Sequence, residues 1–78
     1  MIDIIKPLPA RKVIGALENI GFRQIRQKGS HLFMRHPDGR TTLIPIHPGE
    51  KIGKGMIRKI INDAELTRDK WFDLITDI

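Results

Sequence analysis

The stretch that most constrains the fold covers residues 27–39, where two tight-turn signals bracket a short apolar run. Gly29-Ser30 can form a two-residue hairpin turn. Asp38-Gly39 is a strong hairpin signal, because both residue types tolerate positive φ. If both turns form, residues 23–46 make a three-stranded antiparallel meander. His31 then lies at one end of the middle strand, directly after the first turn.

The predicted strands are residues 23–28, 31–36 and 41–46. Two residues in each turn would place Lys28 opposite His31, Ile25 opposite Met34, and Met34 opposite Leu43. The face expected to pack on helices then carries Ile25, Leu32, Met34 and Leu43. The opposite face carries Arg26, Lys28, His31, Phe33, Arg35, Ile44 and Ile46. Since that second face is partly apolar, either a β-bulge changes the register or a partner covers it.

Three apolar stripes at helical spacing predict one helix before the meander in the sequence and two helices after it. The first stripe is Val13, Ile14, Leu17 and Ile20. Gly21 follows it as a left-handed stop. The second stripe is Ile57, Ile60, Ile61 and Ala64. The third follows Thr67, a suitable N-cap, and is Trp71, Leu74, Ile75 and Ile78. We expect the third helix to complete the core; the alternative is an interaction helix.

The ends of the meander carry prolines. Residues 1–9 are predicted to form an arm, because Pro7 and Pro9 exclude regular strand pairing. Pro9 also suits the first turn of a helix. Pro45 and Pro48 end the third strand, which we expect to be an edge strand.

Length and composition set the class. The 78 residues are expected to form a single α+β domain, residues 1–78. There is no cysteine, so disulfides and thiolate metal sites are excluded. No apolar run approaches the roughly 20 residues of a membrane span. These features favour a cytoplasmic protein without a membrane partner.

Charge is concentrated in the middle of the chain. Residues 22–59 hold nine Lys and Arg against two acidic residues, whereas residues 60–78 hold two basic and five acidic residues. A cationic face on a small domain is the usual footprint of a nucleic-acid partner. Lys54 and Arg58 belong to a basic cluster at the start of the second helix, where free N–H groups and cations together suit a phosphate.

His31 is the strongest candidate for catalysis. An unperturbed histidine titrates near pH 6.5, so it can accept and return a proton at neutral pH. RNA cleavage needs a base for the 2′-hydroxyl, an acid for the leaving 5′-oxygen, and cations near the phosphate. Lys28, Arg26 and Arg35 on the same strand face match that requirement.

Other chemistries are weaker. His31, His36 and His47, with or without Asp38, match no strong zinc spacing, and His36 should point away from His31. A Ser30 nucleophile would need a buried carboxylate to orient a histidine base. Residues 48–55 are glycine-rich but lack the Gly-Lys-Ser/Thr ending of a P-loop, which excludes nucleotide hydrolysis of that kind.

Four motifs in order resemble the HicA-type toxins, also called the YcfA-like family. They are Gly29-Ser30-His31, His36-Pro37-Asp38-Gly39, residues 44–49 (IPIHPG) and residues 54–61 (KGMIRKII). The resemblance covers most of the chain, from the first helix to about Leu66.

The resemblance implies a double-stranded-RNA-binding-domain-like α-β-β-β-α fold, here with a short additional C-terminal helix. It also implies an mRNA interferase of a bacterial or archaeal toxin–antitoxin pair, acting without metal or other cofactor. The catalytic histidine of the family falls on His31. The implied partner is a HicB-type antitoxin, which covers the active site and often represses the operon.

Two departures from the family pattern stand out. Where the family often has Ala-Gly-Leu after the second helix, this chain has Ala64-Glu65-Leu66. Either Glu65 adopts the left-handed C-cap geometry at some cost, or the helix runs on. The acidic tail beyond residue 66 extends past the shortest members.

The sequence therefore predicts an RNA-cleaving toxin with His31 as general base or acid. Single-stranded or locally open mRNA is the expected substrate, because an A-form duplex hides its base edges and constrains in-line attack. His47 is a candidate for the second proton-transfer group. The predicted RNA-binding residues are Lys28, Arg26, Ser30, Arg35, Lys54 and Arg58. The rival interpretations are a non-catalytic RNA-binding module of the same fold and a protein that serves only a protein partner.

Overall fold

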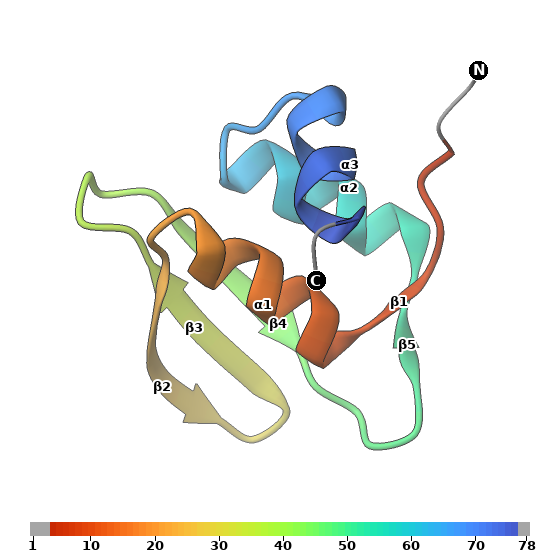
Figure 1. The fold of residues 1–78 in the computed structure, drawn as a ribbon. Coiled ribbons are helices and arrows are strands. Elements are labelled where there is room, and N and C mark those ends of the chain that lie inside the picture. Colours follow the sequence, from red (N-terminus) through yellow and green to blue (C-terminus); the bar gives the residue numbers. More distant parts are fainter. Residues whose placement is uncertain (1–3, 77–78) are drawn as a thin grey trace.

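The computed structural model describes residues 4–76 and shows an α+β fold (Figure 1). Its elements are β1 (Leu8–Pro9), α1 (Ala10–Asn19), β2 (Arg23–Lys28), β3 (His31–Arg35), β4 (Thr41–Pro45), β5 (Lys51–Ile52), α2 (Lys54–Asp63) and α3 (Arg68–Thr76). The antiparallel sheet has the order β2-β3-β4. This confirms the predicted α+β class and the predicted order of helices and principal strands. The likeness to double-stranded-RNA-binding domains stays a prediction.

The helices cover one face of the sheet. Helix α1 packs against β4 and α3, and α2 runs beside β4 (Figure 1). Fifteen buried apolar side chains of residues 4–76 form one core, with the largest fully buried ones from all three helices and the sheet. Trp71 of α3 is 1% exposed, so the expectation that the third helix completes the core is confirmed. Ile78, predicted for its stripe, lies outside the described residues.

The end of α1 forms as the sequence predicts. Val13 and Leu17 are fully buried. Gly21 has φ of 104°, and its N–H donates to the Glu18 carbonyl oxygen at 3.0 Å. The Phe22 N–H donates to the Leu17 carbonyl at 3.0 Å. This pair of bonds is the Schellman motif, which turns the chain from α1 into β2.

The end of α2 uses the same motif without glycine. Glu65 has φ of 55° and is the one non-glycine residue with positive φ among residues 4–76. Its N–H donates to Asn62, and the Leu66 N–H donates to Ile61, both at 3.0 Å. Of the two alternatives in the sequence, the left-handed C-cap is therefore correct. Such a conformation costs about 1–2 kcal/mol for a residue with a Cβ.

The predicted register of the first hairpin is confirmed from the turn back to Arg26 and is wrong from Ile25 on. Lys28 faces His31 across the two-residue turn, as expected. The pairing of Ile25 with Met34 is wrong, because a bulge at Ile25 places Gln24 opposite Met34. The predicted alternative of a β-bulge is thus confirmed.

The second hairpin also differs from the prediction. Arg35 pairs with Thr41, so the connection has five residues rather than two. The His36 N–H donates to the Arg40 carbonyl at 2.8 Å and closes this longer loop. Asp38 stabilises it by accepting from the Arg40 backbone N–H at 3.1 Å. The longer loop shifts the pairing of β4 with β3 by one residue relative to the prediction. Side chains of β4 that were expected on the helix side therefore face solvent, and their neighbours face the helices.

The exchange decides which side chains face solvent. Met34 pairs with Thr42 and not with Leu43. Ile44 is fully buried, whereas Leu43 is 46% and Ile25 is 51% exposed. The predicted helix-side positions of Leu43 and Ile25 and the predicted outer position of Ile44 are therefore wrong. Ile46 packs against the core. Phe33 alone of the three predicted outer apolar residues remains on the outer face, now joined by Leu43.

The N-terminal arm is also paired, contrary to the prediction. Leu8 pairs with Ile52, and Pro9 with Lys51, in a separate two-stranded ladder. A ladder of two residues can include Pro9, which lacks only the N–H donor. Pro9 precedes α1 as its N-cap. Within residues 4–76, no helix has the length and apolar character needed to cross a bilayer.

Candidate active site

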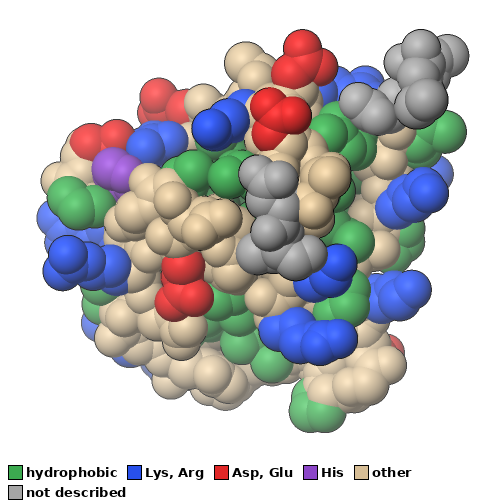
Figure 2. Space-filling model, in the orientation of Figure 1, with side chains coloured by type: hydrophobic (Ala, Val, Ile, Leu, Met, Phe, Trp, Pro, Cys, Tyr) green, Lys and Arg blue, Asp and Glu red, His purple; other side chains and the backbone are tan. Residues whose placement is uncertain are grey.

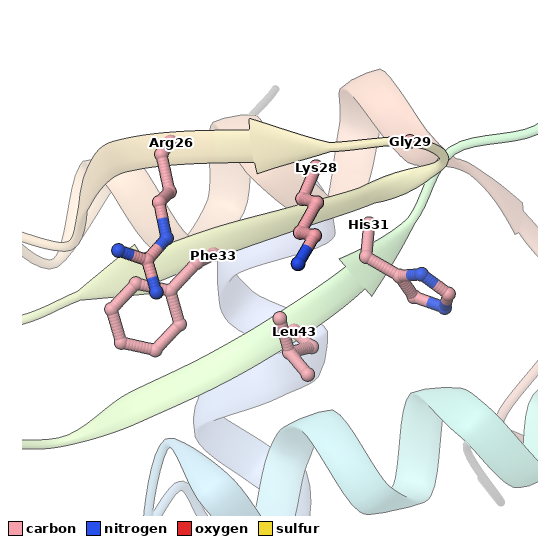
Figure 3. A pocket seen from close by; sticks show the side chains of 6 residues that line it. All are labelled: Arg26, Lys28, Gly29, His31, Phe33 and Leu43. Carbon is pink, nitrogen blue, oxygen red and sulfur yellow. The ribbon is translucent and has the colours of Figure 1, made fainter.

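An open hollow of about 590 Å³ lies on the sheet face opposite the helices (Figure 3). Side chains from all three strands of the main sheet line it. The lining residues are Arg26, Lys28, Gly29, His31, Phe33 and Leu43. Within residues 4–76, the lining is therefore an apolar floor with cationic groups and one imidazole, and it includes no carboxylate.

The β2–β3 turn brings His31 and Lys28 together. Gly29 has φ of 59° at the first central position of the turn, where type II′ hairpins favour glycine. Because the turn has two residues, Lys28 and His31 are direct cross-strand neighbours. Figure 3 shows the Lys28 ammonium group and the His31 ring projecting over the same side of the sheet. Among residues 4–76, neither side chain has a hydrogen-bond or ion-pair partner.

Arg26 and Phe33 form the other end of the hollow. They are cross-strand partners, and the Arg26 Cζ lies 5.8 Å from the centroid of the Phe33 ring. Leu43 pairs with Phe33 from the opposite strand. Figure 3 shows the guanidinium beside the ring, with Leu43 on β4 between this end and His31. The hollow thus combines a cation–π pair with an exposed aliphatic side chain.

The structure places Ser30 and Arg35 outside this lining. Ser30 is the second turn residue, and its carbonyl accepts from the Ile46 N–H at 2.6 Å, which fixes the turn against the end of β4. Arg35 is exposed at the far end of β3, about 13 Å from His31 at the ordinary strand rise. Arg35 shares the outer face with His31 but is not in contact range of the same small group.

The remaining predicted site residues lie elsewhere. Lys54 is exposed at the first residue of α2. Arg58 lines a separate depression that includes Ile5 of the N-terminal segment. His47 is exposed in the loop after β4 and lines a depression next to Pro45. None of the three is among the six residues that line the hollow of His31.

Charge is unevenly distributed over the rest of the surface. Figure 2 shows the face of the molecule seen in Figure 1, with Lys and Arg side chains along its left and right margins. The acidic side chains on this face lie mostly toward the top, where α2 and α3 are drawn. This agrees with a cationic middle and an acidic tail in the sequence.

His36 has a structural environment. Its Nε2 lies 2.9 Å from the Ile20 carbonyl oxygen, and the Asp38 N–H donates to its Nδ1 at 3.1 Å. Since a carbonyl can only accept, Nε2 carries the proton. The ring also meets Phe22 edge to face at 5.3 Å between centroids. His36 therefore joins the end of α1 to the β3–β4 loop.

Asp38 and Arg40 complete that joint. Arg40 Nε donates to Asp38 Oδ2 at 2.9 Å, and this hydrogen bond lowers the pKa of the Asp38 carboxyl below its ordinary value of 3.8. The Arg40 guanidinium also donates to the Ala64 carbonyl oxygen and lies 5.2 Å from the centroid of the Phe22 ring. The loop after β3 is thereby tied to α1 and to the end of α2.

Metal and serine chemistry gain no support from the arrangement. Over residues 4–76, no three His, Asp or Glu side chains come close enough to hold a metal ion. Asp38 is engaged by Arg40 at the opposite end of β3 from Ser30. Among the described residues, no carboxylate lines the hollow to orient a histidine beside a serine nucleophile.

Sequence reasoning missed Leu43 as a lining residue and gave Phe33 no role in binding RNA. The error at Leu43 came from the assumed two-residue second turn. The available signal was the alternation Thr42-Leu43-Ile44, which allows either Leu43 or its two neighbours to face the core. Burial of Thr42 through a hydrogen bond to Asp63 at 2.9 Å decides the choice.

Comparison with known proteins gives a family. A comparison with curated proteins gives no match. The family described as HicA toxin of bacterial toxin–antitoxin systems matches residues 10–66, from the start of α1 to Leu66, the last residue of the α2 C-cap motif. The match covers nearly three quarters of the chain and includes every residue that lines the hollow. The chain therefore belongs to the HicA toxin family, whose members generally cleave RNA and act with a cognate antitoxin.

Proposed function

We propose that this HicA toxin is a cytoplasmic, metal-independent endoribonuclease that cleaves mRNA, with His31 as its general base or general acid. The observation that supports this most is the state of His31. The ring is exposed, has no hydrogen-bond or ion-pair partner among residues 4–76, and lies across from Lys28 in a carboxylate-free hollow. A proton-transfer group that must contact substrate needs this freedom.

The chemistry follows the ribonuclease type. As base, His31 removes the proton of a 2′-hydroxyl, and the 2′-oxygen attacks the adjacent phosphorus. The bond from phosphorus to the 5′-oxygen breaks, and that oxygen takes up a proton. The products are a 2′,3′-cyclic phosphate and a 5′-hydroxyl, so atoms and charge balance without a metal ion.

The cations take separate parts in this scheme. Lys28 is the direct neighbour of His31 and stabilises the negative charge that develops on the scissile phosphate. Arg26, in the same hollow, assists in neutralising the bound strand. Ser30, Arg35, Lys54 and Arg58 are proposed to contact flanking parts of the RNA backbone, because they are spread over the turn, the far end of the outer face and α2.

The second proton-transfer group is proposed to come from outside the hollow. His31 is the one imidazole among the described residues that line the hollow. His47 remains the candidate, and it follows Pro45, the cross-strand partner of His31. Its loop would bring it to the leaving oxygen when RNA is bound.

A HicB-type antitoxin is the proposed protein partner. It would neutralise the toxin by covering the hollow, where Phe33 and Leu43 offer apolar contacts. Carboxylates of the antitoxin would pair with Lys28 and Arg26.

The test is cleavage of single-stranded RNA in EDTA by the wild-type protein and by His31→Ala. Wild-type cleavage with 5′-hydroxyl products, and loss of cleavage with RNA binding retained in His31→Ala, is expected. A substrate with 2′-deoxyribose at the cleavage site should resist the wild-type protein. Equal cleavage by the two proteins would rule out the role of His31.

A non-catalytic RNA-binding module is the second candidate. It is favoured by one observation: the hollow holds a single group suited to proton transfer at neutral pH, where the reaction uses two. If this alternative is correct, wild-type protein and His31→Ala bind RNA equally and neither cleaves it.

A further inference from the structure

We propose that the hollow beside His31 is a nucleobase-binding site, in which one unpaired base of single-stranded RNA stacks on Phe33 between Arg26 and Leu43. This inference rests on the proposed function, because it assigns the part of the substrate that lies next to the reacting phosphate.

Phe33 occupies an unusual position for its residue type. Its strand neighbours Leu32 and Met34 point to the other face and are 3% and 0% exposed. Phe22 and Trp71 are almost fully buried and the half-buried Phe72 packs against the core, whereas Phe33 is half-buried on the solvent side and does not belong to that core cluster. Its ring therefore adds little to the core and forms the floor of the hollow.

The strand pairing fixes what surrounds the ring. The two-residue turn places Arg26 opposite Phe33 on one side, and the five-residue loop places Leu43 opposite it on the other. The Arg26 Cζ lies 5.8 Å from the ring centroid, near the roughly 6 Å limit for a cation–π contact. A planar group can therefore find an aromatic ring, a guanidinium plane and an exposed aliphatic side chain in one place.

The same pairing sets the distance to the reacting group. Phe33 and His31 are two residues apart on one face of β3, which corresponds to about 7 Å. Lys28 projects above the space between them (Figure 3). A phosphate next to Lys28 and His31 and the base of an adjacent nucleotide on Phe33 can thus occupy the two ends of the hollow together.

The chemistry of the lining identifies the occupant. Three of the six residues can be cationic, one is aromatic, one is aliphatic, and none is acidic. Proteins bind single-stranded nucleic acid with this combination of cationic groups along the backbone and an aromatic ring under a base. A base in a duplex is already stacked on its neighbours, so the site requires an unpaired nucleotide.

The inference is tested by RNA binding in the non-cleaving His31→Ala background. Fluorescence anisotropy of a short labelled RNA gives the Kd with and without Phe33→Ala. A matched oligonucleotide of abasic spacers keeps the phosphate chain but has no bases. We expect Phe33→Ala to weaken binding of the RNA about 5- to 150-fold. Binding of the spacer chain should not change.

Three further variants keep the result interpretable. Phe33→Trp should retain or strengthen RNA binding, because it enlarges the stacking surface. Ile25→Ala removes another exposed apolar side chain, which does not line the hollow, and should have no effect. Phe33→Leu keeps an apolar side chain but removes the aromatic ring. If it binds RNA more weakly while its thermal unfolding is unchanged, the loss of binding comes from the missing ring and not from the fold.

The outcomes separate this inference from the proposed function. Unchanged RNA binding in Phe33→Ala, or an equal loss for RNA and spacer chain, overturns the base site even if His31→Ala abolishes cleavage. Base-dependent binding through Phe33, together with cleavage that survives His31→Ala, overturns the catalytic role and leaves the base site standing. Absence of RNA binding by the wild-type protein at low salt overturns both.

Discussion

The two ends of strand β3 each carry a histidine, and the two environments are opposite. His36, directly after the strand, has a partner for each ring nitrogen and lies against Phe22. His31, at its start, is exposed and without a partner among residues 4–76. The chain satisfies every hydrogen-bonding group of one imidazole and none of the other, five residues away. This contrast indicates that His36 maintains the fold and that His31 is available to a ligand.

The cations at the two ends differ in the same way. Arg40 is bound to Asp38, to the Ala64 carbonyl and to Phe22. Lys28 has no internal partner among the described residues. Leaving this cation and this imidazole without partners does not lower the stability of the fold, because both remain hydrated until a ligand binds. Substitutions at one end should therefore affect activity, and substitutions at the other should affect stability.

Removal of the Lys28 ammonium should give the largest effect in this comparison. We expect Lys28→Ala to reduce the rate of RNA cleavage about 100-fold or more, because it removes a charge that stabilises the transition state. The free energy of unfolding should change by less than about 0.5 kcal/mol. Lys70→Ala removes the same charge from α3 and serves as the control, with near wild-type cleavage. A similar small loss in both variants would show that Lys28 acts only through net charge.

Removal of the His36 ring should affect stability. We expect His36→Ala to lower the free energy of unfolding by about 2 kcal/mol, because it leaves the Ile20 carbonyl without its partner and removes an edge contact with Phe22. Urea unfolding followed by circular dichroism measures this. His47→Ala, at an exposed loop position, should change it by less than about 0.5 kcal/mol. Equal stability of the two variants would contradict the structural role of His36.

A substitution at the strained end of α2 should raise the stability instead of lowering it. We expect Glu65→Gly to raise the free energy of unfolding by about 1 kcal/mol, because glycine adopts a φ of 55° without a Cβ clash. Thermal unfolding with Glu65→Ala as the control measures the gain, since alanine keeps the Cβ. If Glu65→Ala stabilises as much as Glu65→Gly, the effect comes from the lost charge and not from the backbone.

The smallest effect concerns Asp38 and pH. Its pKa is lowered in the folded protein by the Arg40 hydrogen bond, so its contribution to stability is present above the ordinary value of 3.8 and is lost as pH falls through the lowered folded pKa. The stability difference between wild type and Asp38→Asn should therefore be constant near neutral pH and shrink in that acid range. Urea midpoints at a series of pH values measure it. A difference that grows on acidification would have the wrong sign for this ion pair.

The sequence was sufficient for local features and insufficient for register. The stripe that ends at Ile20, the stop at Gly21 and the Gly29-Ser30 turn depend on neighbouring residues, and all three are confirmed. The Asp38-Gly39 signal was overridden, because the five-residue loop lets Arg40 reach the Ala64 carbonyl, 24 residues further along the chain. A local pattern cannot report such a contact.

The same limit applies to the candidate site. Lys28 and His31 could be placed together because one short turn joins them. The bulge at Ile25 lies beyond the part of β2 that this turn sets in register, and the pairing of Leu43 with Phe33 follows from the five-residue β3–β4 loop. Consequently the imidazole, its cation and the outward-facing Phe33 were predictable, whereas the position of Leu43 beside Phe33 was not.

The most direct test of the contrast between the two histidines is single-turnover cleavage of RNA by His31→Gln, measured with its RNA affinity and its unfolding on the same preparation. Glutamine keeps a polar side chain but cannot transfer a proton at neutral pH. We expect a loss of cleavage of about 100-fold or more, with RNA affinity and the free energy of unfolding close to those of the wild type. Cleavage at the wild-type rate by a folded His31→Gln protein would contradict it.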